Sequence, residues 1–203
     1  MDMDMGLRER KKRETRQRIS NVATTLFLAR GFDEVTVAEV AEAAQVSKMT
    51  VFNYFPRKED LYLDRHEEII EVLTSAITGR GELSVTAAVR RLCHELTAAG
   101  HPLSGADDGV PRFWSVIKAS PALQLRVLEH LRDTEEALVE LLGGQRDPRA
   151  WQVAGMLLAT VRSVFFANAR AVLDGTPAKT VARRRAHIDR AFDLLESGLG
   201  QLA

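Results

Sequence analysis

The sequence predicts an all-α protein of about nine helices, with a three-helix domain at the N-terminus and a larger helical bundle after it. Apolar residues recur at spacings of three and four, the period of an amphipathic helix. Helix-favouring Ala, Leu, Arg and Glu dominate, and only 6% of the 203 residues are aromatic. Glycines, and prolines preceded by Ser, Asp or Thr, mark the expected helix ends.

The first helix is expected between Arg10 and Arg30. Its apolar residues follow the i, i+3, i+4, i+7, i+8 pattern of one helical face: Ile19, Val22, Ala23, Leu26 and Phe27. Gly31 then supplies the left-handed residue that ends the helix. Phe32, one position later, is expected to pack back on Phe27.

Two short helices follow, joined by a turn of about three residues. Thr36 opens the second helix and forms a capping box with Glu39. This helix runs to about Ala44, because Ser47 caps the third helix almost immediately. The third helix ends near Phe55, since a proline follows it. The spacing is typical of a helix-turn-helix, although similar hairpins also occur in bundles that bind no DNA.

Charge is balanced over the whole chain but not locally. The 28 basic and 28 acidic residues give a net charge of +0, which by itself indicates no partner. Between residues 8 and 18 the basic residues Arg8, Arg10, Lys11, Lys12, Arg13, Arg16 and Arg18 meet only Glu9 and Glu14. Such a cluster favours nucleic acid, because binding to phosphates releases condensed counterions. A solvated tail is the alternative.

The third helix has two different faces. Val51 and Phe55 lie one turn apart and suit packing against the first two helices. The opposite side carries Lys48, Met49, Thr50, Phe52 and Asn53. In a major groove Lys donates to guanine, Asn pairs with adenine, and Met or Thr contacts a thymine methyl group. The Tyr54 hydroxyl suits a phosphate, with packing within the domain as the alternative.

The stretch Thr36–Tyr62, and above all the block T-V-F-N-Y-F-P-R-K-E-D-L from Thr50 to Leu61, resembles the DNA-binding domain of the TetR family of bacterial regulators. The resemblance covers roughly residues 10–65. It implies an all-helical dimer in which residues 8–58 bind operator DNA and residues 59–203 bind a ligand and dimerise. The DNA contacts it implies are Thr36, Ser47, Lys48, Met49, Thr50, Phe52, Asn53, Tyr54 and Lys58.

One position departs from the family pattern. Gln45 stands in the turn where the family often has glycine. A left-handed backbone at a residue with a Cβ atom costs about 1 kcal/mol. We expect the turn to form despite this cost, with slightly different geometry.

A fourth helix is expected to begin near Arg57. The C-terminal part of the chain is expected to form the dimer interface. Trp151–Leu173 is apolar nearly all round, which predicts burial on more than one side. In the last helix, residues spaced by seven, four, three and four form a seam: Val181, Ile188, Phe192, Leu195 and Leu199. These patterns and the resemblance imply an intermolecular four-helix bundle with Val161, Ile188, Phe192 and Leu195 at the interface. Burial within one chain is the alternative. A two-fold dimer reads an inverted repeat.

A ligand pocket is expected in the body, between the fourth and eighth helices. Its candidate residues are His66, Ile70, Cys93, Phe113, Trp114, Arg162, Phe165 and Phe166, with Asn168 as a second polar anchor beside Arg162. Each of these residues is alternatively ordinary core. A guanidinium in an apolar helix calls for a carboxylate or an anionic ligand. The sequence therefore predicts a largely apolar ligand with an acid group, and acyl-CoA thioesters are one candidate.

Several classes of protein are disfavoured. The single cysteine, Cys93, excludes an intrachain disulfide and a cysteine-built zinc site, and fits a reducing compartment. No apolar signal segment opens the chain. Met156–Leu173 is a poor membrane span because Arg162, Asn168 and Arg170 interrupt it. Common catalytic motifs are absent, so we expect no enzyme, no cofactor and no metal.

The sequence therefore predicts a cytoplasmic, sequence-specific, DNA-binding transcriptional regulator. We expect a homodimeric repressor that a small-molecule ligand releases from a palindromic operator. The alternatives are a DNA-binding dimer that senses no ligand and is controlled by a protein partner or by abundance, and an activator.

Overall fold

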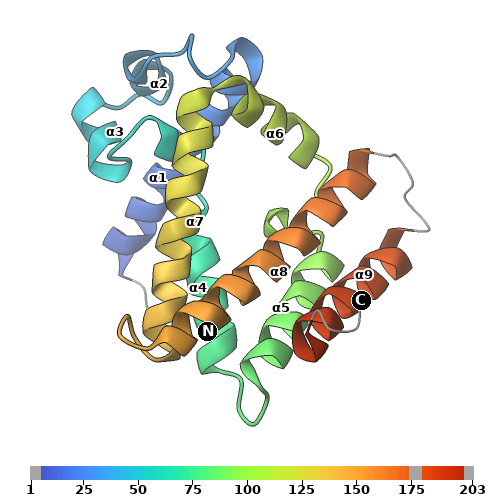
Figure 1. Ribbon diagram of the computed structural model, residues 1–203. Helices are drawn as coiled ribbons and strands as arrows, with labels where there is room; N and C mark the ends of the chain where they lie inside the picture. Colours follow the sequence, from blue (N-terminus) through green and yellow to red (C-terminus); the bar gives the residue numbers. More distant parts are fainter. Residues whose placement is uncertain (1–5, 174–179, 199–203) are drawn as a thin grey trace. The chain divides into compact units, whose positions relative to one another are not determined.

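The computed structural model describes residues 6–173 and 180–198 of the 203-residue chain. Within these ranges the chain forms nine α-helices, two 3-10 helices and no strand, which confirms the all-α prediction (Figure 1). The helices are α1 Leu7–Arg30, α2 Val37–Ala43, α3 Lys48–Tyr54, η1 Glu59–Leu61, α4 His66–Thr78, α5 Val85–Ala98, η2 Pro102–Ser104, α6 Val110–Ala119, α7 Pro121–Leu142, α8 Pro148–Leu173 and α9 Thr180–Ser197.

The chain divides into two compact units. Unit 1 contains the chain through Arg65 together with Arg112–Val127, and unit 2 contains the rest. The sequence suggested a boundary between residues 58 and 59, whereas Leu61 and Tyr62 lie in the core of unit 1. The roles assigned to the two predicted domains stay predictions.

Gly31 ends α1 at the predicted position. Its backbone has φ 90° and ψ 155°, a region that essentially only glycine adopts. The Gly31 N–H donates to the Phe27 carbonyl at 2.9 Å. The centres of the Phe27 and Phe32 rings lie 4.9 Å apart, so the predicted contact across the helix end is confirmed.

Both predicted caps of the short helices are present. The Thr36 Oγ1 accepts from the Glu39 N–H at 3.2 Å, and the Glu39 carboxylate accepts from the Thr36 N–H at 2.7 Å. The hydrogen bond from the Thr36 backbone, with those from Arg30 and the Thr36 hydroxyl, lowers the pKa of Glu39 to about 2. The Ser47 Oγ accepts from the Thr50 N–H at 2.9 Å. These bonds satisfy amides that the helices leave unpaired.

The fourth α-helix begins at His66, not near Arg57 as the sequence suggested. The chain first forms the single turn η1, and the Asp60 Oδ2 accepts from the Arg57 N–H at 3.1 Å. Leu61 and Tyr62 then turn into the core of unit 1.

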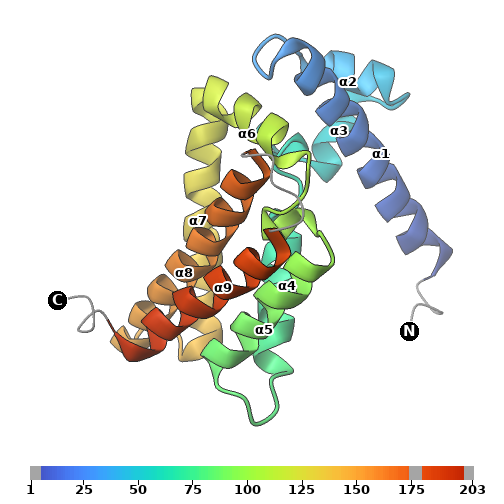
Figure 2. The same ribbon diagram turned by 90° about the vertical axis from the view of Figure 1, so that its right-hand side faces the viewer.

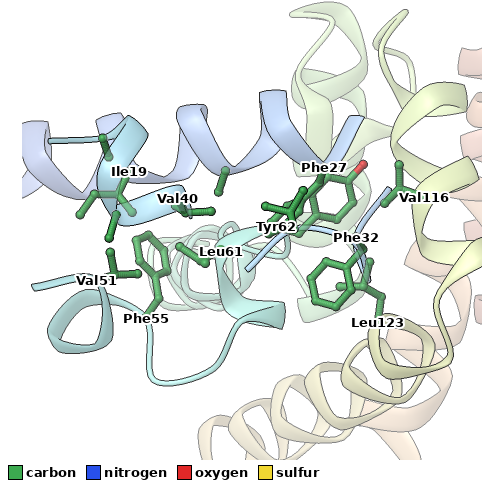
Figure 3. Packing of buried hydrophobic residues seen from close by; sticks show 14 of the residues in the cluster. Ile19, Phe27, Phe32, Val40, Val51, Phe55, Leu61, Tyr62, Val116 and Leu123 are labelled. Carbon is green, nitrogen blue, oxygen red and sulfur yellow. The ribbon is translucent and has the colours of Figure 1, made fainter. Parts of the chain in front are cut away.

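Unit 1 has one hydrophobic core (Figure 3). Buried residues of α1, α2, α3 and η1 meet residues of α6 and α7: Ile19, Phe27, Phe32, Val40, Val51, Phe55, Leu61, Tyr62, Val116 and Leu123. The Tyr62 ring stacks on Phe113 at 4.7 Å, and its hydroxyl donates to the Phe113 carbonyl at 3.1 Å. Arg126 pairs with Asp60 at 2.8 Å, and both side chains are largely buried. The segment 112–127 is therefore an integral part of the unit that carries α3.

Unit 2 has a separate core, in which α8 packs on α9 and both contact α5 (Figure 2). Polar side chains reinforce the contact between α5 and α9. Arg90 donates to the Asp189 carbonyl at 3.1 Å and pairs with Asp193, and the His94 Nε2 lies 2.9 Å from the Asp189 Oδ1. These bonds link residues about one hundred positions apart in the sequence, and they hold the last helix of unit 2 in place.

The seam predicted on the last helix is buried within the chain. Ile188 and Phe192 are completely buried in the core of unit 2, so placing them at a dimer interface was wrong. Leu195 and Val161 are half-buried and pack against the same core. The side chains of Val181 and Leu199 lie outside the described residues.

Within the single chain, α8 is buried on one side, and burial of its other side against a second copy stays a prediction. Its buried residues are Ala150, Ala154, Leu157, Val164, Asn168 and Ala169. The opposite side exposes Met156 and Phe166 at 52% and 46%. In the described part of the chain, α8 is the one helix long and apolar enough to cross a membrane, a test that core helices of soluble proteins also meet.

Candidate nucleic-acid interface

The helix α3 exposes one face to solvent and buries the other, and the exposed face carries both polar and apolar side chains. Lys48, Met49, Phe52 and Asn53 are exposed, whereas Val51 and Phe55 are completely or almost completely buried in unit 1. At 100° per residue the four exposed positions fall on one side of the helix, opposite Val51. Met49 and Phe52 are large apolar side chains that are 69% and 39% exposed. The two faces that the sequence predicts are therefore present.

Two local contacts link residues at the start of α3 and on its exposed face. The Ser47 Oγ lies 2.8 Å from the Thr50 Oγ1, so both hydroxyls are committed to the start of the helix. The Lys48 Nζ lies 5.9 Å from the centre of the Phe52 ring. Lys48, Met49, Phe52 and Asn53 thus form a compact surface, hereafter the α3 face, of the size that enters a major groove.

The turn between α2 and α3 has the geometry that the sequence pattern indicates. Gln45 has a φ of 54°, the one positive φ of a non-glycine residue in the described ranges. Its N–H donates to the Glu42 carbonyl at 3.0 Å, and the Val46 N–H donates to the Ala41 carbonyl at 2.9 Å. The turn therefore forms with a residue that has a Cβ atom, at the steric cost expected for it.

Two arginines of the basic segment stabilise unit 1 itself. Arg18 donates to the carbonyl of Ala44, where α2 ends and a cation is favourable. Arg16 donates to the Asp64 carbonyl at 3.1 Å, and its guanidinium lies 4.8 Å from the centre of the Phe55 ring. Sequence reasoning counted both in one DNA-binding cluster. Both arginines lie within three residues of Ile19, where the apolar pattern of the first helix begins. This position distinguishes them in the sequence from the basic residues between 8 and 14.

The predicted DNA contacts outside the α3 face have structural partners. Thr36 is bound in the capping box, and Tyr54 is half-buried against the core. The Lys58 Nζ donates to the Phe32 carbonyl at 2.6 Å and lies 4.2 Å from the centre of that ring. Burial lowers the pKa of Lys58. A phosphate contact at these positions stays a prediction, and Lys58 has a clear role in folding.

The residues predicted to line a ligand pocket are divided between the two compact units, and their role stays a prediction. Phe113 and Trp114 belong to unit 1, and His66, Ile70, Cys93, Arg162, Phe165 and Phe166 to unit 2. Arg162 is exposed, so water solvates its guanidinium, and the argument that it calls for a carboxylate or an anionic ligand loses its basis. A ligand contact at Arg162 stays a prediction. Phe166 is also exposed, and the centre of its ring lies 5.6 Å from that of Phe165.

Two further pocket candidates have other surroundings. The ring of His66 stacks on that of His130 at 3.8 Å, and its Nε2 lies 3.1 Å from the His130 carbonyl. Cys93 is buried in the core of unit 2, and burial raises the pKa of its thiol to about 12. The thiol is therefore protonated at neutral pH and unreactive as a nucleophile.

Asn168 is the most buried polar side chain of α8. Its Nδ2 donates to the Ser104 carbonyl at 2.8 Å and to the Thr97 Oγ1 at 3.3 Å. A carbonyl only accepts, so this bond sets the orientation of the amide. The Asn168 Oδ1 is buried and has no hydrogen-bond partner among the described residues. A buried acceptor without a partner costs about 1 to 3 kcal/mol, which a donor on a ligand or a water recovers.

Comparisons with known proteins place these features in context. Residues 19–64 match the family described as bacterial regulatory proteins, tetR family. The chain is 32% identical over 136 residues to the HTH-type transcriptional regulator TcmR of Streptomyces glaucescens, covering 64% of this chain and 58% of TcmR. The chain thus spans less than two thirds of the length of this curated relative.

Two solved structures resemble most of the chain. FadR of Thermus thermophilus, a TetR-family transcriptional repressor in complex with lauroyl-CoA, has a TM-score of 0.54 at 25% identity, covering 91% of this chain and 94% of FadR. NalD, the secondary repressor of the MexAB-OprM multidrug efflux pump in Pseudomonas aeruginosa, has a TM-score of 0.54 at 16% identity. The match covers 91% of this chain and 96% of NalD, and at this identity it supports the fold alone.

Proposed function

Because the chain belongs to the TetR family of bacterial regulatory proteins, we propose that it is a sequence-specific DNA-binding repressor whose α3 reads the major groove of an operator. The observation that carries this proposal is the α3 face, which is exposed to solvent. The helix that bears it is capped at its start by Ser47, and its opposite side is buried in the core of unit 1. Lys48 and Asn53 supply the donors and the amide that recognise guanine and adenine edges. Met49 and Phe52 supply apolar contacts to thymine methyl groups.

Alanine substitutions at Lys48 and Asn53 test this assignment. Each is expected to weaken binding to an operator, selected from random duplexes with the wild-type protein, by about 10- to 100-fold. Binding to a scrambled duplex should change much less, because base contacts carry the discrimination. Fluorescence anisotropy at one fixed salt concentration measures both affinities.

Lys118→Ala and Asn21→Ala serve as matched controls, because both residues are exposed on other helices of unit 1. Each control should keep the wild-type preference for the operator. If the α3 variants lost affinity equally for operator and scrambled duplex, α3 would not be the reading helix.

We further propose that two copies associate through the exposed side of α8. Six exposed residues repeat there with spacings of four, three, four, three and four: Gln152, Met156, Ala159, Ser163, Phe166 and Arg170. This is the repeat of a helix packing seam, and the small Ala159 and Ser163 at its centre allow close approach. A second copy is the occupant proposed, because a two-fold dimer places two α3 faces on an inverted repeat.

A small-molecule ligand bound in unit 2 is proposed to release the operator. Two observations support a site there. FadR, which resembles the chain over 91% of its length, is a repressor in complex with lauroyl-CoA. Within unit 2, the buried Asn168 Oδ1 has an unused capacity to accept a hydrogen bond. Ligand binding then favours a conformation with lower operator affinity.

Lauroyl-CoA is the probe that tests this class of ligand. At about 100 times its Kd, a ligand of the folded state stabilises the protein by about 2.7 kcal/mol, which raises the melting temperature by several degrees. Coenzyme A and laurate, each alone, are the controls. The same concentration should release the protein from its operator.

If lauroyl-CoA leaves both the melting temperature and operator binding unchanged, this acyl-CoA class is rejected. The exposure of Arg162 and Phe166, two of the predicted pocket residues, would then favour the second candidate function, a DNA-binding dimer that senses no small molecule.

A further inference from the structure

The first two turns of α1 extend beyond the body of unit 1. Residues 8–14 are all exposed, and Ile19 is the first completely buried residue of the helix. At 1.5 Å per residue, Arg8 lies about 16 Å along the helix axis from Ile19. Figure 2 shows this end of α1 projecting away from α2 and α3. Residues 8–14 are hereafter the α1 extension.

The α1 extension carries a concentrated positive charge. It has five basic and two acidic residues, a net charge of +3 in a chain whose total is +0. Arg10 and Glu14 form an exposed pair at 3.6 Å, which neutralises little because water screens it. Arg8, Lys11 and Lys12 add three more exposed cations.

These cations do not serve the stability of α1. Basic residues in the first turns oppose the helix dipole and cost a few tenths of a kcal/mol each. Gly6, the N-cap residue of α1, has no side chain that could cap the helix and compensate this cost. Arg16 and Arg18 differ, because they bond to backbone carbonyls of unit 1. The charge of the α1 extension therefore suits an external polyanion rather than the fold.

DNA is the polyanion that the surroundings favour. The α1 extension belongs to the same compact unit as the α3 face, the surface proposed to bind a duplex. A lipid surface is disfavoured, because residues 8–14 contain no apolar side chain to insert between lipids. Lysine and arginine bind phosphate oxygens whatever the base sequence.

We infer that the α1 extension binds the phosphate backbone of the duplex that α3 reads, and adds affinity without sequence preference. This inference rests on the proposed function. It divides the basic segment of the chain into two parts, with Arg16 and Arg18 holding unit 1 together and Arg8, Lys11 and Lys12 contacting phosphates.

The triple variant Arg8→Ala, Lys11→Ala, Lys12→Ala tests the inference. Affinity is measured against salt concentration for the selected operator and for a scrambled duplex. The slope of log affinity against log salt should fall by about 0.9 for each phosphate that the variant no longer binds, or about 3 per protomer. At low salt both affinities should drop by a similar factor of about 10 to 100, so the preference for the operator is kept.

Two further variants make the result specific. Arg91→Ala, Arg146→Ala, Arg149→Ala removes the same charge from exposed positions of unit 2 and should leave the slope unchanged. Glu9→Gln with Glu14→Gln makes the α1 extension more positive and should raise affinity and slope. The side chains of the α1 extension are all exposed and belong to no core, so every variant should stay folded, with a melting temperature within a few degrees of the wild type.

The outcomes separate this inference from the proposed function. If the wild-type protein selects no duplex, the proposed function has failed. If it selects one and the triple variant keeps the wild-type slope, the α1 extension does not bind phosphates. If the triple variant instead loses binding to phosphatidylglycerol vesicles and keeps its DNA affinity, the α1 extension binds membranes and the inference is overturned.

Discussion

Replacing Phe27 by alanine is expected to destabilise unit 1 by about 3 to 5 kcal/mol and to leave unit 2 folded. Phe27 is completely buried at the centre of the first core, where its ring contacts Phe32 at 4.9 Å and Tyr62 at 5.8 Å. The change removes the aromatic ring and leaves a cavity that aromatic neighbours cannot fill without leaving their rotamers. A typical domain has only about 5 to 15 kcal/mol of stability, so most of unit 1's margin is removed.

The two tryptophans allow each unit to be followed separately. Trp114 lies in unit 1 and Trp151 in unit 2. In a Trp151→Phe background only Trp114 remains, so urea unfolding monitored by tryptophan fluorescence reports on unit 1. In a Trp114→Phe background only Trp151 remains, and the fluorescence reports on unit 2. Phe27→Ala should move the midpoint of the Trp114 transition to much lower urea and change the Trp151 transition little.

Phe192→Ala is the matched control, because Phe192 is a completely buried phenylalanine of the second core. It should reverse the pattern, with the larger effect on Trp151. Equal shifts of both transitions in either variant would mean that the units unfold together, and the division into two cores would have no energetic counterpart.

Aspartate at both Met156 and Phe166 is expected to convert a dimer of the protein into a monomer. These side chains are 52% and 46% exposed in the single chain and lie on the α8 seam. In a two-fold interface every substitution occurs twice, so four carboxylates would lose their hydration without partners. We expect dimer affinity to fall at least about 100-fold.

Sedimentation equilibrium measures this effect, with the wild type expected at twice the 22.6 kDa mass of the chain. The control is Leu125→Asp with Leu128→Asp on α7, where the leucines are 60% and 62% exposed. This control should stay dimeric, because exposure alone does not make an interface. A monomeric wild type, or a control that dissociates equally, would remove α8 as the dimer surface.

The local features of unit 1 were predictable from the sequence. Gly31, the Thr36–Glu39 capping box, the Ser47 cap and the positive φ of Gln45 all occur where the pattern indicates. Each depends on atoms within about four residues along the chain. The exposed side of α3 was predictable for the same reason, since helical period separates its two faces.

Features that depend on distant partners were not predictable. The Arg16 bond spans 48 positions, and the bond from Arg90 to Asp193 spans 103. Nothing within a few residues of Arg18 indicates that the carbonyl of Ala44 lies within its reach. Ile188 and Phe192 fit either an interface or a core by their spacing, and the contacts of α9 with α5 and α8 decided for the core.

The sequence by itself determined an all-helical chain, the positions of its caps and turns, and the composition of the α3 face, because these follow from short-range hydrogen bonding and helical period. Only the tertiary structure decided that Arg112–Val127 belongs to the unit that carries α3, that Arg162 is exposed, and that the α1 extension stands apart from Arg16. Burial is a property of the elements that meet in space, and a spacing pattern does not say which elements those are.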